Sequence, residues 1–239
     1  MLQLRLQPIR VFCLHHVSDK YNPLTMWECD WTQTELFKRN ILSLKQQGVI
    51  FLSLADAYDK LRHDLFRHKK YVVLTADDGY KSILNILPWL EEQQIPITLF
   101  INTKYLNGKS WSAINEEQAR RAKHDVDMLK DVCPDLYMSK EELFGLTSQY
   151  ISIGMHGHEH MDATVQTEAE FRKNVMQCRD IIKEHPRYIL FFAYPWGQYN
   201  DSTDVILKET GLIPVLTNDG VNYDDKGFID RLIMDGKQL

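Results

Sequence analysis

Short apolar runs alternate with amphipathic stretches of helical length along most of this chain. Seven runs rich in Val, Ile, Leu and Phe are each too short for a helix and are bounded by polar or turn residues. These predicted strands are Ile9–Leu14, Val49–Ser53, Tyr71–Thr75, Thr98–Ile101, Ile151–Met155, Tyr188–Ala193 and Ile213–Thr217. Such alternation predicts repeated βα units around a parallel sheet or barrel.

Four stretches between the strands have the periodicity of amphipathic helices. They are Thr32–Gln47, Lys81–Gln93, Thr167–Glu184 and Ser202–Thr210. The first begins with a Thr/Glu capping pattern, and the last ends at Gly211, as a helix C-terminus commonly does. Because no linker or internal repeat divides the chain, we expect a single α/β domain over residues 1–239, a distorted (β/α) barrel of about seven parallel strands, similar to a TIM barrel.

One segment, at about 107–137, departs from this alternation and contains the charged run NEEQARRAKHDVDMLKD. It lies between a predicted strand and a helix that starts near Ser139. Charge runs are most often solvated faces, although long insertions after barrel strands also act as lids. We interpret the segment as a helical insertion.

The composition is that of an ordinary globular protein, with 44% hydrophobic and 26% charged residues and a formal net charge of −5. It excludes disorder as the main state and leaves no basic field to attract a nucleic acid. The four cysteines form no CxxC pair, so neither a zinc ribbon nor a disulfide scaffold is indicated. Neither a secretory signal nor an apolar run of roughly 20 residues is present, so we expect a cytoplasmic protein without a membrane span. The oligomeric state stays open.

Two adjacent carboxylates, Asp77 and Asp78, follow a predicted strand in the run LTADDGY. Like charges this close raise one of the two pKa values, and a cation beside them removes the conflict. A metal ligand next to a general base is one such arrangement. The alternative is that one of the two aspartates caps the helix that follows.

Three of the nine histidines fall within five residues in the run GMHGHEH. His156 and His160 are spaced i, i+4, so a helical turn would place both imidazoles on one face, at a separation suited to one divalent ion. His158 would then point to a different face. Imidazoles with a carboxylate suit zinc and also Fe(II), Co(II) or Ni(II), which leaves the ion open.

Two further segments end predicted strands. FFAYPWGQYN breaks into an aromatic, proline and glycine loop that either stacks on sugar rings or fills a barrel rim. LHHVSD carries His15 and His16, and a lone histidine in such a place is by default a core residue. All four candidates lie where parallel barrels assemble active sites. One Asp and two His for a metal, with a spare Asp and a spare His, are the minimal set for metal-assisted hydrolysis.

The motifs LTADDGY, SIGMHGHEH and FAYPWGQYN, in this order, resemble the polysaccharide deacetylases of the NodB-homology type, carbohydrate esterase family 4, over most of the chain. The likeness of LTADDGY to TFDDG implies Asp77 as catalytic base and Asp78 as metal ligand. The likeness of HGHEH to H-(S/T)-x-x-H implies His156 and His160 as the other ligands. FAYPWG is similar to RPPYG, a groove wall with a backbone oxyanion contact, which implies that substrate is bound by Tyr194, Pro195, Trp196 and Gly197.

The opening CLHHVSD resembles the subgroup in which the motif order is circularly permuted, with the acid histidine in a YHxV pattern near the N-terminus. This resemblance implies His15 as general acid. Ala193 stands where many members have an arginine that pairs with the catalytic aspartate, and Arg231, in FIDRLIM, is the candidate replacement.

The resemblance implies a hydrolase that removes acetyl or related acyl groups from an amino sugar in a glycan or glycoconjugate. It would use one divalent metal ion, zinc in the first place, with Fe2+, Co2+ or Ni2+ as alternatives. Two other functions stay open. One is a carbohydrate-binding or assembly protein with weak turnover, which the missing arginine at Ala193 would favour. The other is deacylation of a small amide or a sugar-nucleotide precursor.

Overall fold

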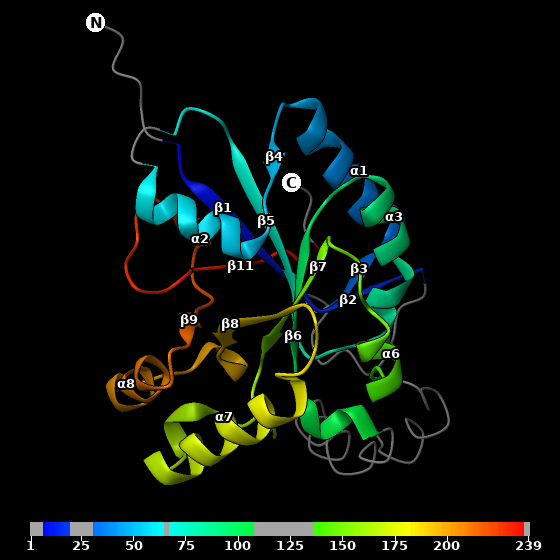
Figure 1. The fold of residues 1–239 in the computed structure, drawn as a ribbon. Helices are drawn as coiled ribbons and strands as arrows, with labels where there is room; N and C mark the ends of the chain where they lie inside the picture. The colour runs from blue at the N-terminus through cyan, green and yellow to red at the C-terminus, as the bar shows by residue number, and fades with distance from the viewer. Residues whose placement is uncertain (1–6, 20–30, 65–66, 108–135, 237–239) are drawn as a thin grey trace, which may run out of the picture.

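The fold is a single α/β unit built on a strongly curled, mostly parallel sheet, which confirms the predicted barrel-like class. The computed structural model describes residues 7–19, 31–64, 67–107 and 136–236 (Figure 1). Along the sheet the strand order is β10-β1-β5-β6-β7-β8-β9, and neighbours run parallel except for the antiparallel pair of β10 and β1. Two further strands join this sheet at its sides, β11 beside β1 and β4 beside β5.

The strands are β1 (Ile9–Leu14), β2 (His16–Ser18), β3 (Trp31–Gln33), β4 (Ile50–Phe51), β5 (Tyr71–Ala76), β6 (Ile97–Ile101), β7 (Ile151–Met155), β8 (Tyr188–Ala193), β9 (Ile213–Val215), β10 (Val221–Asn222) and β11 (Leu232–Ile233). The helices are α1 (Thr34–Gln46), α2 (Leu54–His63), α3 (Leu87–Glu92), α6 (Lys140–Phe144), α7 (Glu168–Ile182) and α8 (Asp201–Glu209). Short 3-10 turns are η2 (Lys81–Asn85), η3 (Thr103–Asn107), η4 (Ala163–Val165) and η5 (Pro195–Gly197).

Each predicted strand is present, and β1, β7 and β8 have the predicted bounds. The helix predicted over Lys81–Gln93 is divided into η2 and α3, because Pro88, in the first turn of α3, has no N–H with which to continue the preceding turn. The capping pattern predicted at Thr32 is also wrong. Thr32 belongs to β3, and its hydroxyl accepts the N–H of Gly236 instead of capping α1.

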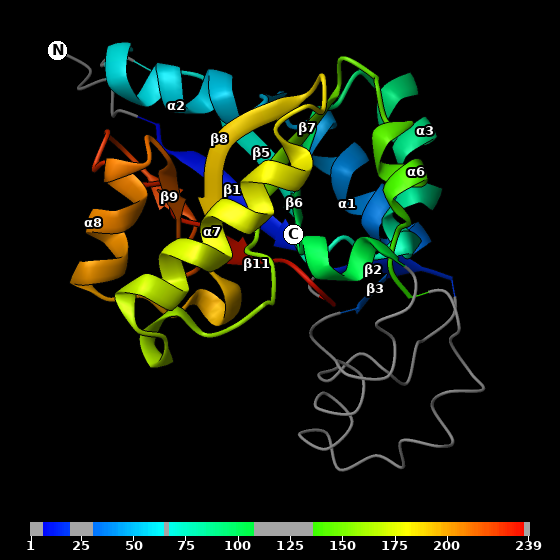
Figure 2. The same ribbon diagram turned by 60° about the horizontal axis from the view of Figure 1, so that its bottom comes forward.

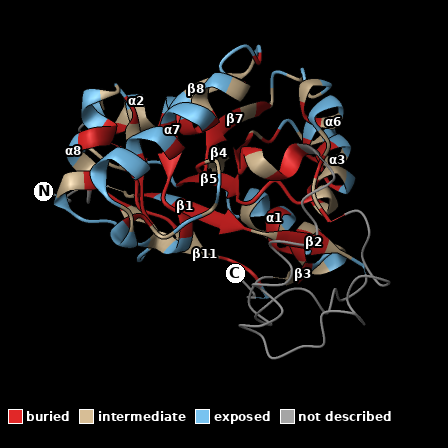
Figure 3. Cartoon of the chain, turned by 90° about the horizontal axis from the view of Figure 1, so that it is seen from below, coloured by how far each residue is buried: buried red, intermediate tan, exposed pale blue. Residues whose placement is uncertain are grey.

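Alternating side chains divide the core into two clusters, one on each face of the sheet. The inner cluster joins Val11, Val73 and Phe100 to Leu54 and Leu61 of α2. Outer-facing side chains of the same strands pack against the remaining helices. Figure 2 shows these helices ranged around the outside of the sheet, and Figure 3 shows buried strands enclosed by helices whose outer faces are exposed.

The segment 229–233 spans from β9 to β1. Ile229 forms a parallel bridge with Val215 of β9, and β11 pairs in parallel with Phe12–Cys13 of β1. Between these two attachments, Arg231 is completely buried. The C-terminal part of the chain therefore brings a cation into the interior of the curled sheet.

Most of the predicted insertion, residues 108–135, lies outside the described residues. Its far end is attached close to the site: Tyr137 bridges to Tyr80, and α6 starts near Ser139 as the sequence predicted, with Ser139 as its N-cap. Among the residues that the structure describes, no helix is both long enough and apolar enough to cross a bilayer.

Candidate active site

The candidate residues meet at the carboxyl ends of the parallel strands, where barrels assemble their sites. Asp77 and Asp78 follow β5, His156 follows β7, and His15 follows β1. Of these four side chains, three are buried and the His15 ring is 17% exposed. Strand alternation explains the placement of Asp77, His156 and His15, because these positions continue the inner face of their strands. Asp78 is one residue out of phase and has a positive φ of 70°.

Asp78, His156 and His160 form a compact group with the chemistry of a metal site. The Nε2 atoms of His156 and His160 lie 3.3 and 3.1 Å from Oδ1 of Asp78, and the three ligand atoms lie within 4.8 Å of one another. Two imidazole nitrogens and one carboxylate oxygen are a donor set that suits Zn2+, Fe2+, Co2+ or Ni2+. The residues present therefore fit the implied ion.

Neighbouring groups fix the orientation of these ligands. Nδ1 of His156 donates to the backbone oxygen of Ala193 at 2.8 Å, which leaves Nε2 to face Asp78. The side-chain amide of Asn102 donates to Oδ1 of Asp78 at 2.9 Å. Hydrogen bonds behind the ligands set their tautomer and direction and thereby raise metal affinity. The sequence motifs gave no indication of Asn102.

The helical turn predicted at His156–His160 is wrong. The segment has no regular secondary structure and bends at Gly157, whose φ is +80°. A Cβ at this glycine would lie 3.0 Å from Oδ1 of Asn174, and that oxygen accepts the N–H groups of His158 and Glu159. A glycine loop held by α7, instead of a helix, thus brings His156 and His160 together.

Backbone strain is concentrated around this group. Among the described residues, four that are not glycine have positive φ, and three of them are Asp78 (70°), His160 (51°) and Trp196 (62°). Residues other than glycine rarely adopt positive φ unless the surrounding structure holds them there. Two of the three candidate ligands, Asp78 and His160, therefore have a strained backbone, which is typical of functional sites.

Asp77 is bound at both oxygens by Arg231. Nη1 donates to Oδ1 at 2.6 Å and Nη2 to Oδ2 at 2.8 Å. Burial alone would raise the pKa of Asp77, but the charges of Arg231 and His156 outweigh burial and lower that pKa to about 2. The guanidinium thus holds the carboxylate ionised and fixes its orientation.

His15 is paired with Asp235, 2.7 Å from Nδ1 to Oδ2. Burial acts to lower the pKa of His15, but the carboxylate of Asp235 outweighs it and raises the pKa to about 10. His16 behaves oppositely: burial, and then the charge of His15, lower its pKa to about 3. Its ring stacks on Tyr80 at 3.7 Å and lies 3.2 Å from Ser82 Oγ. His16 is thus the core histidine of the pair.

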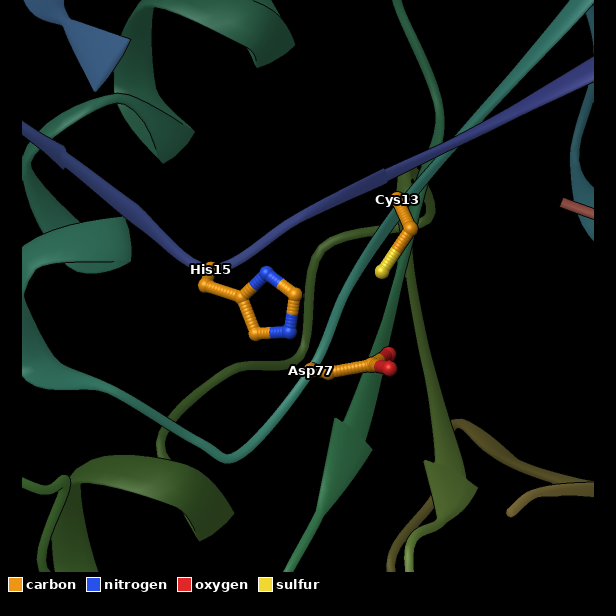
Figure 4. A group of neighbouring side chains, drawn as sticks. All are labelled: Cys13, His15 and Asp77. Atoms are coloured by element: carbon orange, nitrogen blue, oxygen red, sulfur yellow. The ribbon is translucent and has the colours of Figure 1, made fainter. Parts of the chain in front are cut away.

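Cys13, His15 and Asp77 also converge, with the thiol and the imidazole both directed toward the carboxylate (Figure 4). Their ligand atoms lie within 4.8 Å of one another, so the geometry alone would admit a metal ion. Burial, however, raises the pKa of the Cys13 thiol well above its ordinary value, and both Asp77 oxygens are bonded to a guanidinium. Of the two groups, Asp78, His156 and His160 are therefore the candidate metal site.

The family model for polysaccharide deacetylases matches residues 66–215, more than half of the chain. The chain belongs to the polysaccharide deacetylase family. It is thus a deacetylase-like hydrolase, and its metal-type triad and carboxylate pair lie within the matched range. A comparison with curated proteins found no match.

Solved structures share the fold of this family member at low sequence identity. IcaB from Ammonifex degensii is similar with a TM-score of 0.76 and 21% identity over 96% of this chain and 93% of that one. The deacetylase PplD from Streptococcus pyogenes, solved in complex with acetate, has a TM-score of 0.74 and 19% identity over 95% and 92%. These likenesses show the curled half-barrel as the common fold.

The loop after β8 contains the four residues predicted to bind substrate in this deacetylase-family chain. Trp196 is 38% exposed, its ring lies 4.9 Å from that of His160, and its indole N–H donates to the backbone oxygen of His160 at 3.3 Å. Pro195 is buried and Gly197 takes a positive φ of 66°. Trp196 therefore gives this loop its large exposed surface next to the candidate ligand His160.

For Tyr194 the structure requires a correction. Its side chain is buried and its ring packs against Phe171 and Phe192, on the outer face of the sheet. Its own backbone N–H donates to the backbone oxygen of Val215 at 3.3 Å in the pairing of β8 with β9, so it is not the N–H near Tyr194 that the resemblance implied as an oxyanion contact. The strand alternation that points Ala193 inward points Tyr194 outward.

Proposed function

We propose that this chain is a metal-dependent deacetylase that removes acetyl or related acyl groups from the nitrogen of an amino sugar in a glycan or glycoconjugate. One observation carries this proposal. In a single site, a triad suited to a divalent ion stands beside a carboxylate held by Arg231 and an imidazole held by Asp235. Such a site supplies a base, an acid and an electrophile for amide hydrolysis.

Asp78, His156 and His160 would hold the ion, which we expect to be Zn2+, with Fe2+, Co2+ and Ni2+ as alternatives. When bound, a divalent ion acts as a Lewis acid toward a substrate carbonyl. The proton transfers are carried out by side chains of this chain. Family membership supports this assignment, as does the strained backbone at Asp78 and His160.

Asp77 acts as the general base. Each carboxylate oxygen has two lone pairs, so an Asp77 bonded to Arg231 can still accept a proton from the attacking water. Arg231 is a positioning residue that keeps Asp77 ionised and aimed. It takes the place of the arginine missing at Ala193, which removes the main support for a binding protein without turnover.

His15 acts as the general acid. Because Nδ1 is bonded to Asp235, the proton available for transfer is on Nε2. As the carbon–nitrogen bond breaks, the leaving amine takes this proton. The raised pKa of His15 keeps the imidazole protonated near neutral pH. His15 precedes Asp77 in the chain, which supports the proposal that the motif order is circularly permuted.

Trp196 is the residue that we expect to bind the sugar. Its exposed ring beside His160 offers an apolar face on which a pyranose can stack. Two structural neighbours support acetyl as the acyl group. One is PplD, solved with acetate, and the other is a de-N-acetylase from Aggregatibacter actinomycetemcomitans with a TM-score of 0.65 and 16% identity.

Acetate release tests the proposal. The protein is stripped with a chelator, loaded with Zn2+, Co2+, Ni2+ or Fe2+, and incubated with oligomers of N-acetylglucosamine. We expect metal-dependent release of acetate, and we expect Asp77→Asn to retain the metal but lose turnover because an amide cannot accept the proton. Glycan affinity without acetate release in every loaded form would instead support a binding protein.

The cytoplasmic location expected from the sequence remains a proposal. Fractionation of cells that produce the full-length protein would test it.

A further inference from the structure

We propose that Phe100 is a positioning residue of this site: its ring supports one face of the Arg231 guanidinium, and Gly154 provides the room that the ring needs. The inference rests on the proposed function, because it concerns how Asp77 is aimed. Phe100 lies on β6 and belongs to the inner core cluster. It would act on the reaction through Arg231 and not through the substrate.

Every N–H donor of the Arg231 guanidinium has an acceptor. Arg231 has five N–H donors, and two of them bind Asp77. The other three donate to Leu216 O at 3.2 Å, Thr75 Oγ1 at 3.1 Å and Thr217 Oγ1 at 3.3 Å. These five bonds fix the plane of the group. Other groups can therefore contact the guanidinium only above and below this plane, on its two faces.

One of these faces is covered by Phe100. The guanidinium carbon of Arg231 lies 5.1 Å from the centre of the Phe100 ring, and both side chains are completely buried. A cation over an aromatic face is attracted by the ring quadrupole, most strongly where water is absent. The ring thus stabilises the buried guanidinium in the position in which it binds the Asp77 carboxylate.

Gly154 is required by space and not by backbone conformation. Its φ is not in the left-handed region, so any residue could adopt its backbone. A Cβ at this position, however, would lie 2.5 Å from Cε1 and 2.6 Å from Cδ1 of Phe100. It would also lie 3.3 Å from the backbone oxygen of Phe191. Any side chain at position 154 would therefore displace the ring that supports Arg231.

A matched pair of substitutions separates positioning from ordinary packing. Phe100→Leu removes the aromatic face beneath Arg231. Phe191→Leu makes the same chemical change in the same core cluster, where the ring meets Tyr58 edge-on. Both variants should lower Tm to a similar extent, because both remove similar apolar contacts. We expect only Phe100→Leu to lower kcat, by about 5- to 30-fold, with KM within about twofold and zinc content unchanged.

Gly154→Ala provides a second route to the same effect. Because it would act by moving Phe100, it should also lower kcat without loss of zinc. The double variant Gly154→Ala/Phe100→Leu should lose no more kcat than the larger single loss, since both changes act through one ring. Fully multiplicative losses, or equal kcat losses in Phe100→Leu and Phe191→Leu, would overturn the proposal.

A spectroscopic measurement keeps the contact testable without turnover. In the zinc-loaded protein, the ring current of Phe100 should shift the Arg231 Nε–H resonance. The shift should be lost in Phe100→Leu and kept in Phe191→Leu. If the wild-type protein shows this shift but releases no acetate with any metal, the proposed function fails while the contact stands. If acetate is released and Phe100→Leu keeps the wild-type kcat, the positioning role fails alone.

Discussion

His15 and Asp235 stand 220 positions apart in the chain, and their side chains are joined at 2.7 Å from Nδ1 to Oδ2. The second oxygen of Asp235 accepts the backbone N–H of His15 at 3.1 Å. One carboxylate therefore fixes both the imidazole and the strand end that carries it. The protonation of the proposed acid at the start of the chain depends on a residue near its other end.

Asp235→Asn should lower the pKa of His15 from about 10, because burial is then opposed only by the smaller effects of Asp78 and Asp77. In the wild-type protein the folded-state pKa lies above the unfolded value of about 6.5. The resulting stability is fully present below pH 6.5 and is lost as the pH rises through about 10. Metal-free wild type should therefore lose Tm across this window more steeply than Asp235→Asn. Parallel Tm curves for the two proteins would contradict the pairing.

Removal of the two neighbouring histidines should have different effects. We expect His15→Ala to lower kcat by roughly 10² to 10⁴, the usual scale for loss of general acid catalysis. His16→Ala should change kcat less and Tm more, since the His16 ring is buried against Tyr80. Acetate release and thermal unfolding of both variants provide the comparison. A larger kcat loss in His16→Ala would transfer the role of acid to His16.

The metal assignment predicts different outcomes for three histidines in one loop. His156→Ala and His160→Ala should each lose most of the bound zinc, because each removes one of three protein ligands. His158→Ala should keep it, since Nδ1 of His158 lies 2.9 Å from Thr103 Oγ1 and faces η3. Metal content per chain, measured after dialysis, checks this prediction. Similar zinc loss in all three variants would show that the ligand set is wrong.

Arg231→Lys should retain the metal and lower kcat by about 10- to 100-fold, because an ammonium cannot bind both carboxylate oxygens in parallel. The pKa of Asp77, held at about 2 by Arg231, should rise toward its ordinary value. A base must be ionised to act, so the acidic limb of the pH–rate profile should move to higher pH. An unchanged profile and rate would mean that Asp77 works independently of Arg231.

The sequence predicted strands best where apolar runs end sharply. β1 and β7 have the predicted bounds because a histidine follows each run directly, and β8 ends one residue before the turn at Pro195; the candidate residues stand just beyond these ends. The pairing of Arg231 with Asp77 could be suggested because a resemblance showed that an arginine was missing. What failed was the local geometry of 156–160, where the i, i+4 spacing suggested a helix and Gly157 produced a bend.

Asp235 and Asn102 were missed because their partners are set by tertiary structure. A single aspartate after the short run LIM has no periodic neighbour to mark it. The available signal was its position, an Asp-Gly pair after an apolar run, as in Asp78-Gly79. Asn102 directly follows β6, a strand end that no recognised motif occupied.

Attachment of segment 229–233 between β9 and β1 has a consequence for the order in which activity arises in a cell. Synthesis proceeds from the amino end, so the strands that carry Asp78, His156 and His160 are made before Arg231 and Asp235 emerge from the ribosome. A nascent chain can therefore contain Asp78, His156 and His160 while the proposed base, Asp77, lacks its guanidinium and the proposed acid, His15, lacks its carboxylate. On the proposed mechanism, hydrolysis therefore requires segment 229–235 to be made, although the candidate metal ligands are made earlier.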